Sequence, residues 1–568
     1  MSRIPADYAP TIAPTEFIAP PAAGADERID VGVLFVGGGP AGLAGAIRLA
    51  QLLESAPDVK ERLGEVPIAV VEKGKYPGAH LVSGAVINPV ALRKLFPDVP
   101  DARLPFRGPV TGEAVYLLTE TGAIRVPTPP TMKNHGNHSA SLSEVARWMA
   151  ERAEAMGVML LNETTATTLL MQDGAVHGIR SGDKGLDRDG SPMSNHEPGA
   201  EIHARATVLS EGVIGHLAQS LIAHQGLHGE NPQSYSLGVK EVWEVPKPLD
   251  RVIHTVGWPL RSGRRWREFG GTFIYPMGPH QVSLGIVVGL DYADNSLSPH
   301  DLLQQLKLHP LVAGIIKGGT RHERGGGWGA KTIPEGGWYA LPRRLAVPGG
   351  GSLFTGDCAG FVNVPAIKGI HYAMWSGMLA AETIFEALRA GKDPRAPGVL
   401  DGYDAAVRAS FIGRDLRRVR NMRQAMNAGL VAGGAMAGLM TLTAGAFPGG
   451  RFRSEASADT SVEPGGRTYP RADGRVTFDK LSSVYASGNR TRDTQPNHLR
   501  IRTDVPEDVA NAWIAMCPAA VYEWATDDAG RKVLRVNPPN CVQCGAISAK
   551  GGRFTPPEGG SGPEYTVT

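Results

Sequence analysis

A glycine-rich turn between an apolar segment and a helical pattern restricts the fold of this chain more than any other feature. Residues 31–36 are apolar, Gly37-Gly38-Gly39-Pro40-Ala41-Gly42 follows directly, and helical spacing continues to about residue 53. In a G-x-G-x-x-G turn the first glycine makes the tight turn, the second lets the backbone approach a pyrophosphate, and the third lets the helix pack closely on the strand. The helix N-terminus then favours the negative charge of the pyrophosphate. We predict these three roles for Gly37, Gly39 and Gly42.

A second apolar strand completes the expected βαβ unit. Residues 67–72, with the sequence PIAVVE, end on Glu72, whose carboxylate is placed to accept hydrogen bonds from ribose hydroxyls. A glycine turn without a ligand is the alternative, and such a turn alone is a weak signal. The strand, the helix and the terminal acid together favour a bound dinucleotide.

A later strand that ends in Gly356-Asp357 favours FAD over NAD. Residues 352–360 have the sequence SLFTGDCAG, and flavoproteins use an aspartate in such a turn on the ribityl-phosphate side. The distance from the first glycine turn predicts an FAD domain assembled from separated segments. No second G-x-G-x-x-G follows a strand, so we predict no dedicated nicotinamide domain and expect the electrons to arrive another way.

Length and charge set the broad class of the protein. The chain has 568 residues, 42% of them hydrophobic and 20% charged, which is enough for several globular domains. A formal net charge of +2 argues against a nucleic-acid partner, because such partners require concentrated Lys and Arg. The first 30 residues resemble neither a signal peptide nor a transit peptide, so we expect a cytosolic N-terminus.

One stretch without charged residues is a candidate for membrane contact. Residues 428–447 carry no charge over 20 positions, which is long enough to span a bilayer core of about 30 Å. Its Gly and Ala content is high, so we favour a segment that lies on the membrane over one that spans it, with a buried core helix as the third alternative. Arginines flank it on both sides: Arg414, Arg417, Arg418, Arg420, Arg423, Arg451 and Arg453.

The cysteines gather near the C-terminus. Three of the four, Cys517, Cys541 and Cys544, lie in the last tenth of the chain, and the fourth, Cys358, belongs to the Gly-Asp turn. This distribution disfavours a disulfide scaffold and raises the question of a metal or cluster site.

Several strings closely resemble the electron transfer flavoprotein-ubiquinone oxidoreductase family. They extend over nearly the whole chain from residue 28. They include Gly78-Ala79-His80 through Ser83-Gly84-Ala85, His254-Thr255-Val256-Gly257-Trp258-Pro259-Leu260, Gly270-Gly271-Thr272-Phe273, Gly289-Leu290-Asp291-Tyr292, Gly360-Phe361-Val362-Asn363-Val364-Pro365 and Ile367-Lys368-Gly369.

The resemblance implies an α/β plus α+β fold of three intertwined parts. An FAD-binding Rossmann-like domain of the glutathione reductase type is interleaved with a quinone-binding domain, and a ferredoxin-like module follows. We expect the first FAD segment at 28–110, a mixed FAD and quinone domain with β-sheet at 111–345, an FAD return segment with a membrane-associated helical region at 346–450, and the iron-sulfur-type module at 476–568.

The resemblance also implies residue roles. The paired glycines at Gly270 and Gly271 match the family's quinone site, where bare backbone lets a flat ring approach; a strand bulge is the alternative. Asn363 and the Lys368-Gly369 pair are placed to reach the isoalloxazine ring and tune its potential. The family usually has Gly-Thr-His here, whereas this chain has Gly369-Ile370-His371, so a hydroxyl is absent.

The family's cluster pattern is incomplete in this chain. It consists of one Cys-Pro and a later C-x-x-C-x-x-C, four thiolates being usual for a 4Fe-4S cluster. Cys517-Pro518 and Cys541-Val542-Gln543-Cys544 match, but Ile547 occupies the last ligand position. The three cysteines are compatible with a 3Fe-4S cluster, a 4Fe-4S cluster with a non-cysteine ligand, zinc, or an empty module.

The resemblance implies a membrane-associated flavoprotein that passes electrons from reduced electron transfer flavoprotein to ubiquinone or menaquinone. Because positioned cofactors carry such a reaction, no catalytic acid or base is expected. The expected location is the membrane surface, as a monotopic protein on the cytoplasmic face of a bacterial inner membrane. The alternatives are an FAD-dependent reductase or hydroxylase of a lipid-like substrate, similar to geranylgeranyl reductases, with a vestigial cysteine module, and a non-enzymatic flavin scaffold.

Overall fold

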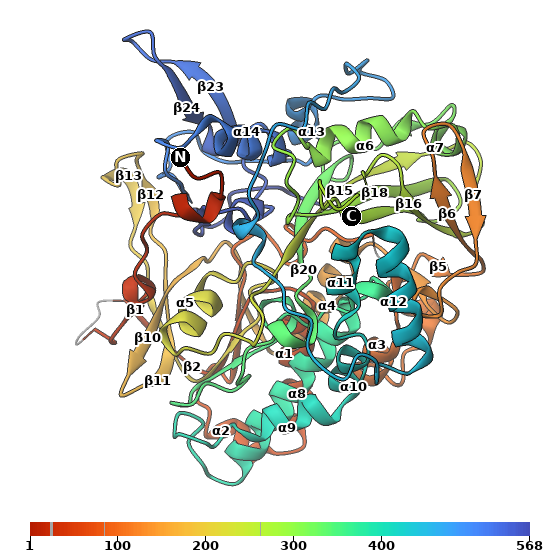
Figure 1. Cartoon of the computed structure of the whole chain (residues 1–568). Helices are drawn as coiled ribbons and strands as arrows, with labels where there is room; N and C mark the ends of the chain where they lie inside the picture. Colours follow the sequence, from red (N-terminus) through yellow and green to blue (C-terminus); the bar gives the residue numbers. More distant parts are fainter. Residues whose placement is uncertain (23–26, 85, 262) are drawn as a thin grey trace.

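The computed structural model describes the whole chain except residues 23–26, 85 and 262. Ala85, part of one string that carries the family resemblance, therefore lies outside the described residues. Two mixed sheets form the centre of the molecule, and the described part of the chain contributes eight strands to each (Figure 1).

The first sheet has the order β1-β10-β11-β14-β2-β3-β9, with β21 also paired to β14. Its centre is parallel: β2 (Arg28–Val36) lies between β14 (Glu201–Leu209) and β3 (Ile68–Val71). The consecutive apolar residues of β2 and β3 are buried, as expected for parallel strands. The other strands are β1 (Ile18–Ala19), β9 (Met159–Leu161), β10 (Ala166–Gln172) and β11 (Ala175–Ser181).

The predicted βαβ unit is confirmed. Helix α1 (Pro40–Glu54) joins β2 to β3, with a short α2 (Pro57–Glu61) between them. Helix α4 (Leu142–Ala155) starts at Ser141, whose hydroxyl accepts a hydrogen bond from the Glu144 N–H. Two further helices in this half are α3 (Val90–Leu95) and α5 (His216–His224).

A segment from far downstream returns to the first sheet. Strand β21 (Ser352–Phe354) pairs in parallel with the end of β14, from Thr207↔Ser352 to Leu209↔Phe354. Helix α8 (Ile370–Arg389) then packs against α1. The FAD-type domain is therefore assembled from separated segments, as the sequence predicts.

Glycines allow α1 and α8 to approach with their backbones in contact. A Cβ atom at Gly377 of α8 would lie 2.0 Å from the carbonyl oxygen of Ala41 in α1. One at Gly45 of α1 would lie 2.9 Å from the carbonyl oxygen of Gly377. Both helices begin at a glycine, Gly39 for α1 and Gly369 for α8, and both glycines line one cavity.

The second sheet has the order β19-β15-β18-β17-β16-β6-β7, with β20 also paired to β15. The pairings are antiparallel except that of β16 with β6. Helix α6 (Pro299–Lys307) covers this sheet, followed by α7 (Pro310–Ile316) (Figure 1). The strands are β6 (Glu113–Leu118), β7 (Ala123–Val126), β15 (Tyr235–Glu244), β16 (Val252–Gly257), β17 (Gly270–Pro276), β18 (Gln281–Gly289), β19 (Thr320–Arg321) and β20 (Gly329–Pro334).

The uncharged stretch folds as a short helix. Helices α9 (Gly402–Ala409), α10 (Phe411–Arg418) and α11 (Met422–Ala425) lead to α12 (Leu430–Leu442), which has 13 residues. At 1.5 Å per residue α12 is about 20 Å long, shorter than a bilayer core of about 30 Å. In the described part of the chain, no helix combines the length and apolar character needed to cross a membrane.

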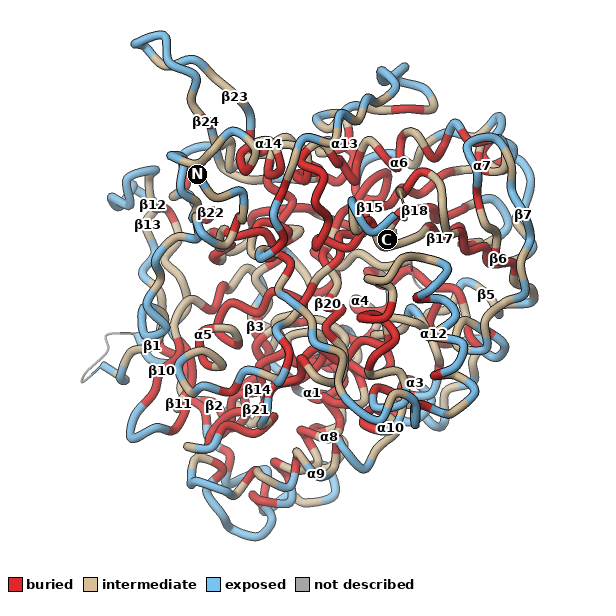
Figure 2. The backbone as a smooth tube through the Cα atoms, viewed as in Figure 1, coloured by how far each residue is buried: buried red, intermediate tan, exposed pale blue. Residues whose placement is uncertain are grey.

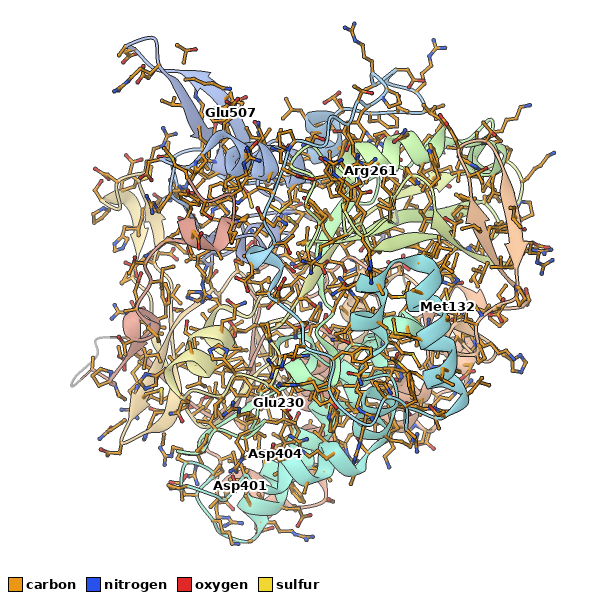
Figure 3. All side chains as sticks on the ribbon, in the orientation of Figure 1. Met132, Glu230, Arg261, Asp401, Asp404 and Glu507 are labelled. Atoms are coloured by element: carbon orange, nitrogen blue, oxygen red, sulfur yellow. The ribbon has the colours of Figure 1, made fainter. Side chains whose placement is uncertain are left out.

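Residues that follow α12 are fixed to the second sheet by buried charges. Arg467 bonds to Glu268 and Asp294, and Arg261, labelled in Figure 3, bonds to the same two carboxylates. Both carboxylate side chains are fully buried. The segment 452–475, which the sequence suggests is a linker, is thus partly embedded in the protein.

The C-terminal module packs directly on the second sheet. Trp513, Met516 and Ile547 belong to the same buried apolar cluster as Leu284 and Trp328 of the sheet region, and Figure 2 shows continuous burial there. The hairpin of β23 and β24 projects from the module (Figure 1). The elements are α13 (Lys480–Ala486), β22 (Leu499–Arg500), α14 (Glu507–Met516), β23 (Tyr522–Thr526), β24 (Lys532–Val536), α15 (Ala546–Ala549) and β25 (Arg553–Phe554).

Small sheets complete the described structure. Strands β4 (Val86–Ile87), β8 (His138–Ser139) and β5 (Gly108–Pro109) form one, and β12 (Lys184–Leu186) pairs with β13 (Pro192–Glu197) in another.

Candidate functional site

A cavity of about 960 Å³ lies where the two sheets, α12 and the cysteine loop meet. This volume is at the upper end of the range for ligand sites in proteins. Its walls include predicted residues from three distant parts of the sequence, among them Gly39, Gly271 and Cys544. Met132, labelled in Figure 3, lines the same cavity.

The glycine turn has the geometry that its predicted roles require. Gly37 has φ 115°, and a Cβ atom there would lie 2.3 Å from the carbonyl oxygen of Ser210. A Cβ at Gly42 would lie 2.1 Å from the carbonyl oxygen of Gly37, so the helix and the turn touch at this point. The nearest atom to a Cβ at Gly39 is 3.9 Å away, and no side chain caps α1. The backbone at Gly39 is therefore open to a ligand.

Glu72 lies beside this turn at the end of β3. Its Oε2 accepts a hydrogen bond from the Gly38 N–H at 3.0 Å, and its Oε1 accepts one from the Gly74 N–H at 2.6 Å. Burial raises the pKa of this carboxyl, whereas the two N–H groups lower it. The carboxylate is fixed at the cavity wall, where a ribose would be expected.

The Gly-Asp turn lies directly beside the glycine turn, since a Cβ at Gly356 would lie 3.1 Å from Ala41 Cβ. Gly356 has φ 62°, and its N–H donates to the Ser376 hydroxyl of α8 at 2.9 Å. Asp357 lines the cavity, and burial raises its pKa from 3.8 to about 6, an effect that Lys331 opposes. A Cβ at Gly369 would lie 3.7 Å from Asp357 Oδ1, so this carboxylate and the start of α8 are neighbours.

Asn363 lies behind the cavity wall. Its Oδ1 accepts a hydrogen bond from the Ala366 N–H at 3.2 Å, and its Nδ2 donates to the Tyr372 hydroxyl at 3.3 Å. Its neighbours Val362 and Val364 line the cavity, whereas Asn363 itself does not. The side chain fixes the shape of the 363–368 loop in this structure. His371 lines the cavity, and burial lowers its pKa to about 3, which keeps the ring neutral.

Two partly buried lysines in the cavity wall were missed by sequence reasoning. Lys331 of β20 donates to the Gln543 carbonyl at 3.0 Å, and burial lowers its pKa. Lys73 follows Glu72, and burial together with the charge of Lys331 lowers its pKa to about 7. Little in the sequence indicated that these lysines belong to the site, because each is a single basic residue next to apolar strand residues. Both cations lie between the flavin-type turns and the cysteine loop.

The paired glycines Gly270 and Gly271 line the cavity. Close packing within the sheet is enough to explain why both positions are glycine. A Cβ at Gly270 would lie 2.0 Å from the Val287 carbonyl oxygen, and one at Gly271 would lie 2.5 Å from the Thr255 carbonyl oxygen. Their register in β17 is regular, opposite Val288 and Val287 of β18. The bulge that sequence offered as the alternative is thus absent from this described pairing.

Helix α12 closes the cavity with one face. The lining residues recur at helical spacing on that face: Leu430, Gly434, Ala437, Gly438, Thr441 and Leu442. Val431 is 87% exposed and Leu442 is 86% exposed. The helix therefore contributes small residues to the cavity and large apolar ones to the surface.

Two of the flanking arginines form hydrogen bonds or ion pairs within the protein. Arg423 is buried and pairs with Asp291 and Glu335, each at 2.7 Å. Arg420 donates to the Tyr339 hydroxyl at 3.2 Å and to the Gly445 carbonyl that follows α12. Arg423, one of the seven flanking arginines, is therefore neutralised inside the protein.

The structure brings the three predicted cysteines together. Burial raises the pKa of Cys541, and the thiols of Cys544 and Cys517 raise it further; burial also raises the pKa of the Tyr522 phenol, and all three thiols add to that shift. Backbone N–H groups point at the sulfurs: Val521 to Cys517 and Gln543 to Cys541, each at 3.4 Å, and Ala546 to Cys544. The thiols are free, and Cys544 lines the large cavity.

The residues fit FAD but do not fit a cluster with four cysteine ligands. The open backbone at Gly39, the two uncapped helix starts and the fixed Glu72 suit a dinucleotide. Ile547 is 4% exposed and contributes no lone pair to the cysteine loop. Among the described residues, His, Cys, Asp and Glu side chains form no group of three or more that could hold a metal ion, so the neighbouring thiols do not converge on a single point.

Comparison with solved structures agrees with this architecture. A geranylgeranyl bacteriochlorophyll reductase-like protein from Thermoplasma acidophilum superposes with a TM-score of 0.55 at 16% identity, over 73% of this chain and 92% of that one. Residues 90–232 match the family model "FAD binding domain". The fold and the site define a flavin-dependent oxidoreductase, and the FAD cofactor predicted from the sequence is confirmed.

Two further family models and the curated relatives identify the family. Residues 235–333 match "ETF-QO, ubiquinone-binding", and residues 474–566 match "Electron transfer flavoprotein-ubiquinone oxidoreductase, 4Fe-4S". The mitochondrial electron transfer flavoprotein-ubiquinone oxidoreductase of Dictyostelium discoideum is 38% identical over 94% of this chain and 90% of its own length. That of Pseudomonas aeruginosa is 37% identical over 95% of this chain and 99% of its own. The chain belongs to the electron transfer flavoprotein-ubiquinone oxidoreductase family.

Proposed function

We propose that this protein passes electrons from reduced electron transfer flavoprotein, through FAD, to ubiquinone or menaquinone. One observation carries the proposal: a single cavity connects the FAD-type turns at Gly39 and Asp357 with an apolar face of α12. A flavin at one end and a lipid-soluble ring at the other are the two ligands that such walls suit. The names of the curated relatives support the donor and the acceptor.

The FAD end of the cavity depends mainly on backbone groups. Bound FAD would supply reversible electron chemistry that amino-acid side chains lack. The N–H groups at the start of α1 would bind its pyrophosphate, next to Gly37, Gly39 and Gly42. Glu72 would accept from the adenosine ribose, and Asp357 from the ribityl side. Gly356 and Gly369 would let the backbone approach the ring system, and Asn363 would hold the adjoining loop.

The quinone end of the cavity combines glycines with apolar side chains such as Leu260 and Leu430. Gly270 and Gly271 leave a flat backbone surface on β17, and Gly434 and Gly438 leave space on α12. These surfaces would admit a flat ring and exclude water from it. The acceptor would thereby be held near the flavin without an acid or base in direct contact.

The same helix provides the proposed membrane contact. Val431 and Leu442 project from α12, so the helix would lie in the membrane interface and give the quinone a path to the cavity. We place the protein on the cytoplasmic face of a bacterial inner membrane. A bacterial relative and the free thiols, which suit a reducing compartment, support that side.

A cavity-filling variant tests the proposed function. A Cβ at Gly438 has no atom within 4 Å, so Gly438→Phe fills the cavity without a clash in the helix. We expect it to reduce ubiquinone turnover with reduced electron transfer flavoprotein at least 10-fold and to leave FAD content unchanged. Ala435→Phe on the exposed side of α12 is the matched control and retains turnover.

A substitution at Gly271 would be a poorer test, because any side chain there would strike the Thr255 carbonyl oxygen. Equal turnover in Gly438→Phe and wild type would show that the quinone does not bind in this cavity. Reduction of a prenyl lipid with a nicotinamide donor, without any response to the flavoprotein donor, would favour the reductase alternative.

A further inference from the structure

We infer that the C-terminal module is built for an iron-sulfur cluster held by three cysteine thiolates, of the 3Fe-4S type, in place of the four-thiolate cluster that the family model names. The inference goes beyond the proposed function, because cluster type is measured without quinone turnover. It rests on the three sulfurs, on the fourth position and on the surroundings of the loop.

The three thiols lie in a loop whose backbone is shaped for sulfur ligands. Gln543 has φ 54° and Gly545 has φ 85°, and these left-handed residues turn backbone N–H groups toward the sulfurs. The Gln543 N–H lies 3.4 Å from Cys541 Sγ, and the Val521 N–H lies 3.4 Å from Cys517 Sγ. N–H groups gathered in this way are typical of iron-sulfur sites, where they stabilise negative sulfur.

The loop is fixed from outside by β20. Thr332 binds the Cys544 carbonyl twice, through its N–H at 3.0 Å and its hydroxyl at 2.8 Å. Lys331 donates to the Gln543 carbonyl at 3.0 Å. A Cβ at Gly545 would lie 2.6 Å from Ile214 Cγ1, so the loop is packed closely against the FAD-type domain. A loop held by this many contacts would keep its three thiols in place, unlike an unstructured remnant.

The position of the family's fourth cysteine ligand is taken by Ile547, whose side chain is packed in the protein interior. Ile547 is 4% exposed in α15, and its Cγ1 lies 2.5 Å from where a Cβ at Gly552 would be. The Gly552 N–H donates to the Ile547 carbonyl at 2.9 Å, which fixes the short turn that follows. The isoleucine fills an apolar space and provides no ligand for a fourth iron.

Two other side chains near the loop carry an oxygen atom. Gln543 Nε2 donates to the Ser561 carbonyl at 2.8 Å, whereas its buried Oε1 has no hydrogen-bond partner among the described residues, so Gln543→Ala tests for a non-cysteine ligand. The described His, Cys, Asp and Glu residues form no group of three that could hold a single ion, which disfavours zinc. A cluster binds each thiolate through a different iron, so it does not require the sulfurs to converge. Burial raises the pKa of the Tyr522 phenol and all three thiols raise it further, so this oxygen is close enough to them to be tested as a ligand.

Metal content and EPR of the anaerobically purified full-length protein test the inference. We expect about three irons per FAD, with matching acid-labile sulfide. A low-temperature EPR signal should be present in the oxidised protein and disappear on one-electron reduction. A four-iron cluster is silent when oxidised and becomes paramagnetic when reduced. Anaerobic purification prevents oxidative loss of a fourth iron from giving the same signal.

Substitution at the fourth position provides the decisive comparison. Ile547→Cys supplies the missing thiolate, so iron should rise to about four per FAD and the EPR signal should move to the reduced state. Ile547→Ala removes the same side chain without supplying a ligand, and it should keep the three-iron signature. Tyr522→Phe should also keep it, whereas Cys544→Ser should lose iron at unchanged FAD content.

Several results would overturn the inference. Wild-type protein that contains FAD but no iron would show an empty module, and zinc in place of iron would show a single-ion site. Four irons in wild type, or loss of the fourth in Tyr522→Phe, would show a non-cysteine ligand. Each result stands whether or not the protein reduces quinone, so failure here is distinguishable from failure of the proposed function.

Discussion

At the scale of single residues, Asp357 shows how the ligand site costs stability. Burial raises its pKa from 3.8 to about 6 in the folded protein without FAD. The folded state therefore binds more protons than the unfolded state between these two values, and stability falls as pH rises through that window. Above pH 6 the full cost of the buried charge is present. The carboxylate that is placed to bind FAD therefore lowers the stability of the protein before FAD binds.

Asp357→Asn should separate stability from FAD binding. Without the buried charge, the FAD-free protein should gain about 2–4 °C in Tm at pH 7. The gain should disappear well below pH 3.8, where Asp357 is protonated in both the folded and the unfolded state. FAD affinity should fall about 10-fold, because an amide is a weaker acceptor than a carboxylate. Thermal melts of FAD-free protein and fluorescence titration with FAD measure the two effects. A variant that is less stable at pH 7 would contradict this view of Asp357.

Lys331 is a second residue whose effect the structure makes measurable. Its cation lies in the cavity wall and acts on Asp357, so it should stabilise electrons placed on the flavin. Lys331→Met should lower the midpoint potential of FAD by on the order of 50 mV. The exposed Lys317→Met is the matched control and should leave the potential unchanged. Spectroelectrochemical titration measures both, and an unchanged potential in Lys331→Met would mean that the cation is screened from the flavin.

The role of a residue could be predicted from the sequence where the backbone conformation permits only one residue type. Gly37 and Gly42 illustrate this, because each would clash with a carbonyl oxygen if it carried a Cβ. Asn363 and Gly271 were harder, because their neighbours come from the 363–368 loop and from a distant strand. Lys331 was missed because its contact with Gln543 joins residues more than 200 positions apart.

At the scale of elements, α12 has two functions that its sequence alone does not separate. One face lines the cavity mainly with small residues, together with Leu430 and Leu442, and the other presents Val431 and Leu439 to the surface. The sequence indicated an uncharged segment, but the helix ends at Leu442, well before residue 447. Gly429, with φ 92°, precedes the helix and Gly445, with φ 85°, follows it, so left-handed glycines interrupt a stretch that hydropathy treats as continuous.

The outer face of α12 should determine membrane binding. Val431→Asp combined with Leu439→Asp places two charges on that face and should reduce binding to anionic lipid vesicles at least 10-fold. Leu481→Asp on α13 is the control, since Leu481 is also exposed but lies in the C-terminal module. Vesicle flotation measures the bound fraction. Equal losses in both variants would indicate general adhesion of apolar residues in place of a defined membrane face.

At the scale of the whole molecule, the two sheets and the C-terminal module share their cores. Strand β21 completes a sheet begun by β2 more than 300 residues earlier, and Trp513 packs in the same cluster as Leu284. Such pairings join distant positions, so local patterns cannot reveal them. The sequence predicted the interleaved FAD domain through its two turns, but it suggested a free linker at 452–475, where the structure has the Arg467 network.

Removal of the C-terminal module should therefore destabilise the rest of the protein. A chain that ends at residue 475 would expose the apolar surface that Trp513 and Met516 cover. We expect it to be largely insoluble or to be cleaved by protease in the second sheet within minutes, under conditions where the full chain resists. Full solubility, with normal FAD content and the same protease resistance, would show that the shared core contributes little.

The most direct test of the electron relay is an anaerobic stopped-flow experiment on the purified protein. Reduced electron transfer flavoprotein is mixed with the oxidised protein, and ubiquinone is added in a second mixing step. The flavin absorbance of this protein should bleach in the first step and recover in the second, in proportion to the quinone reduced. Bleaching by a nicotinamide donor but not by the flavoprotein, or no recovery with quinone, would contradict a relay between the two.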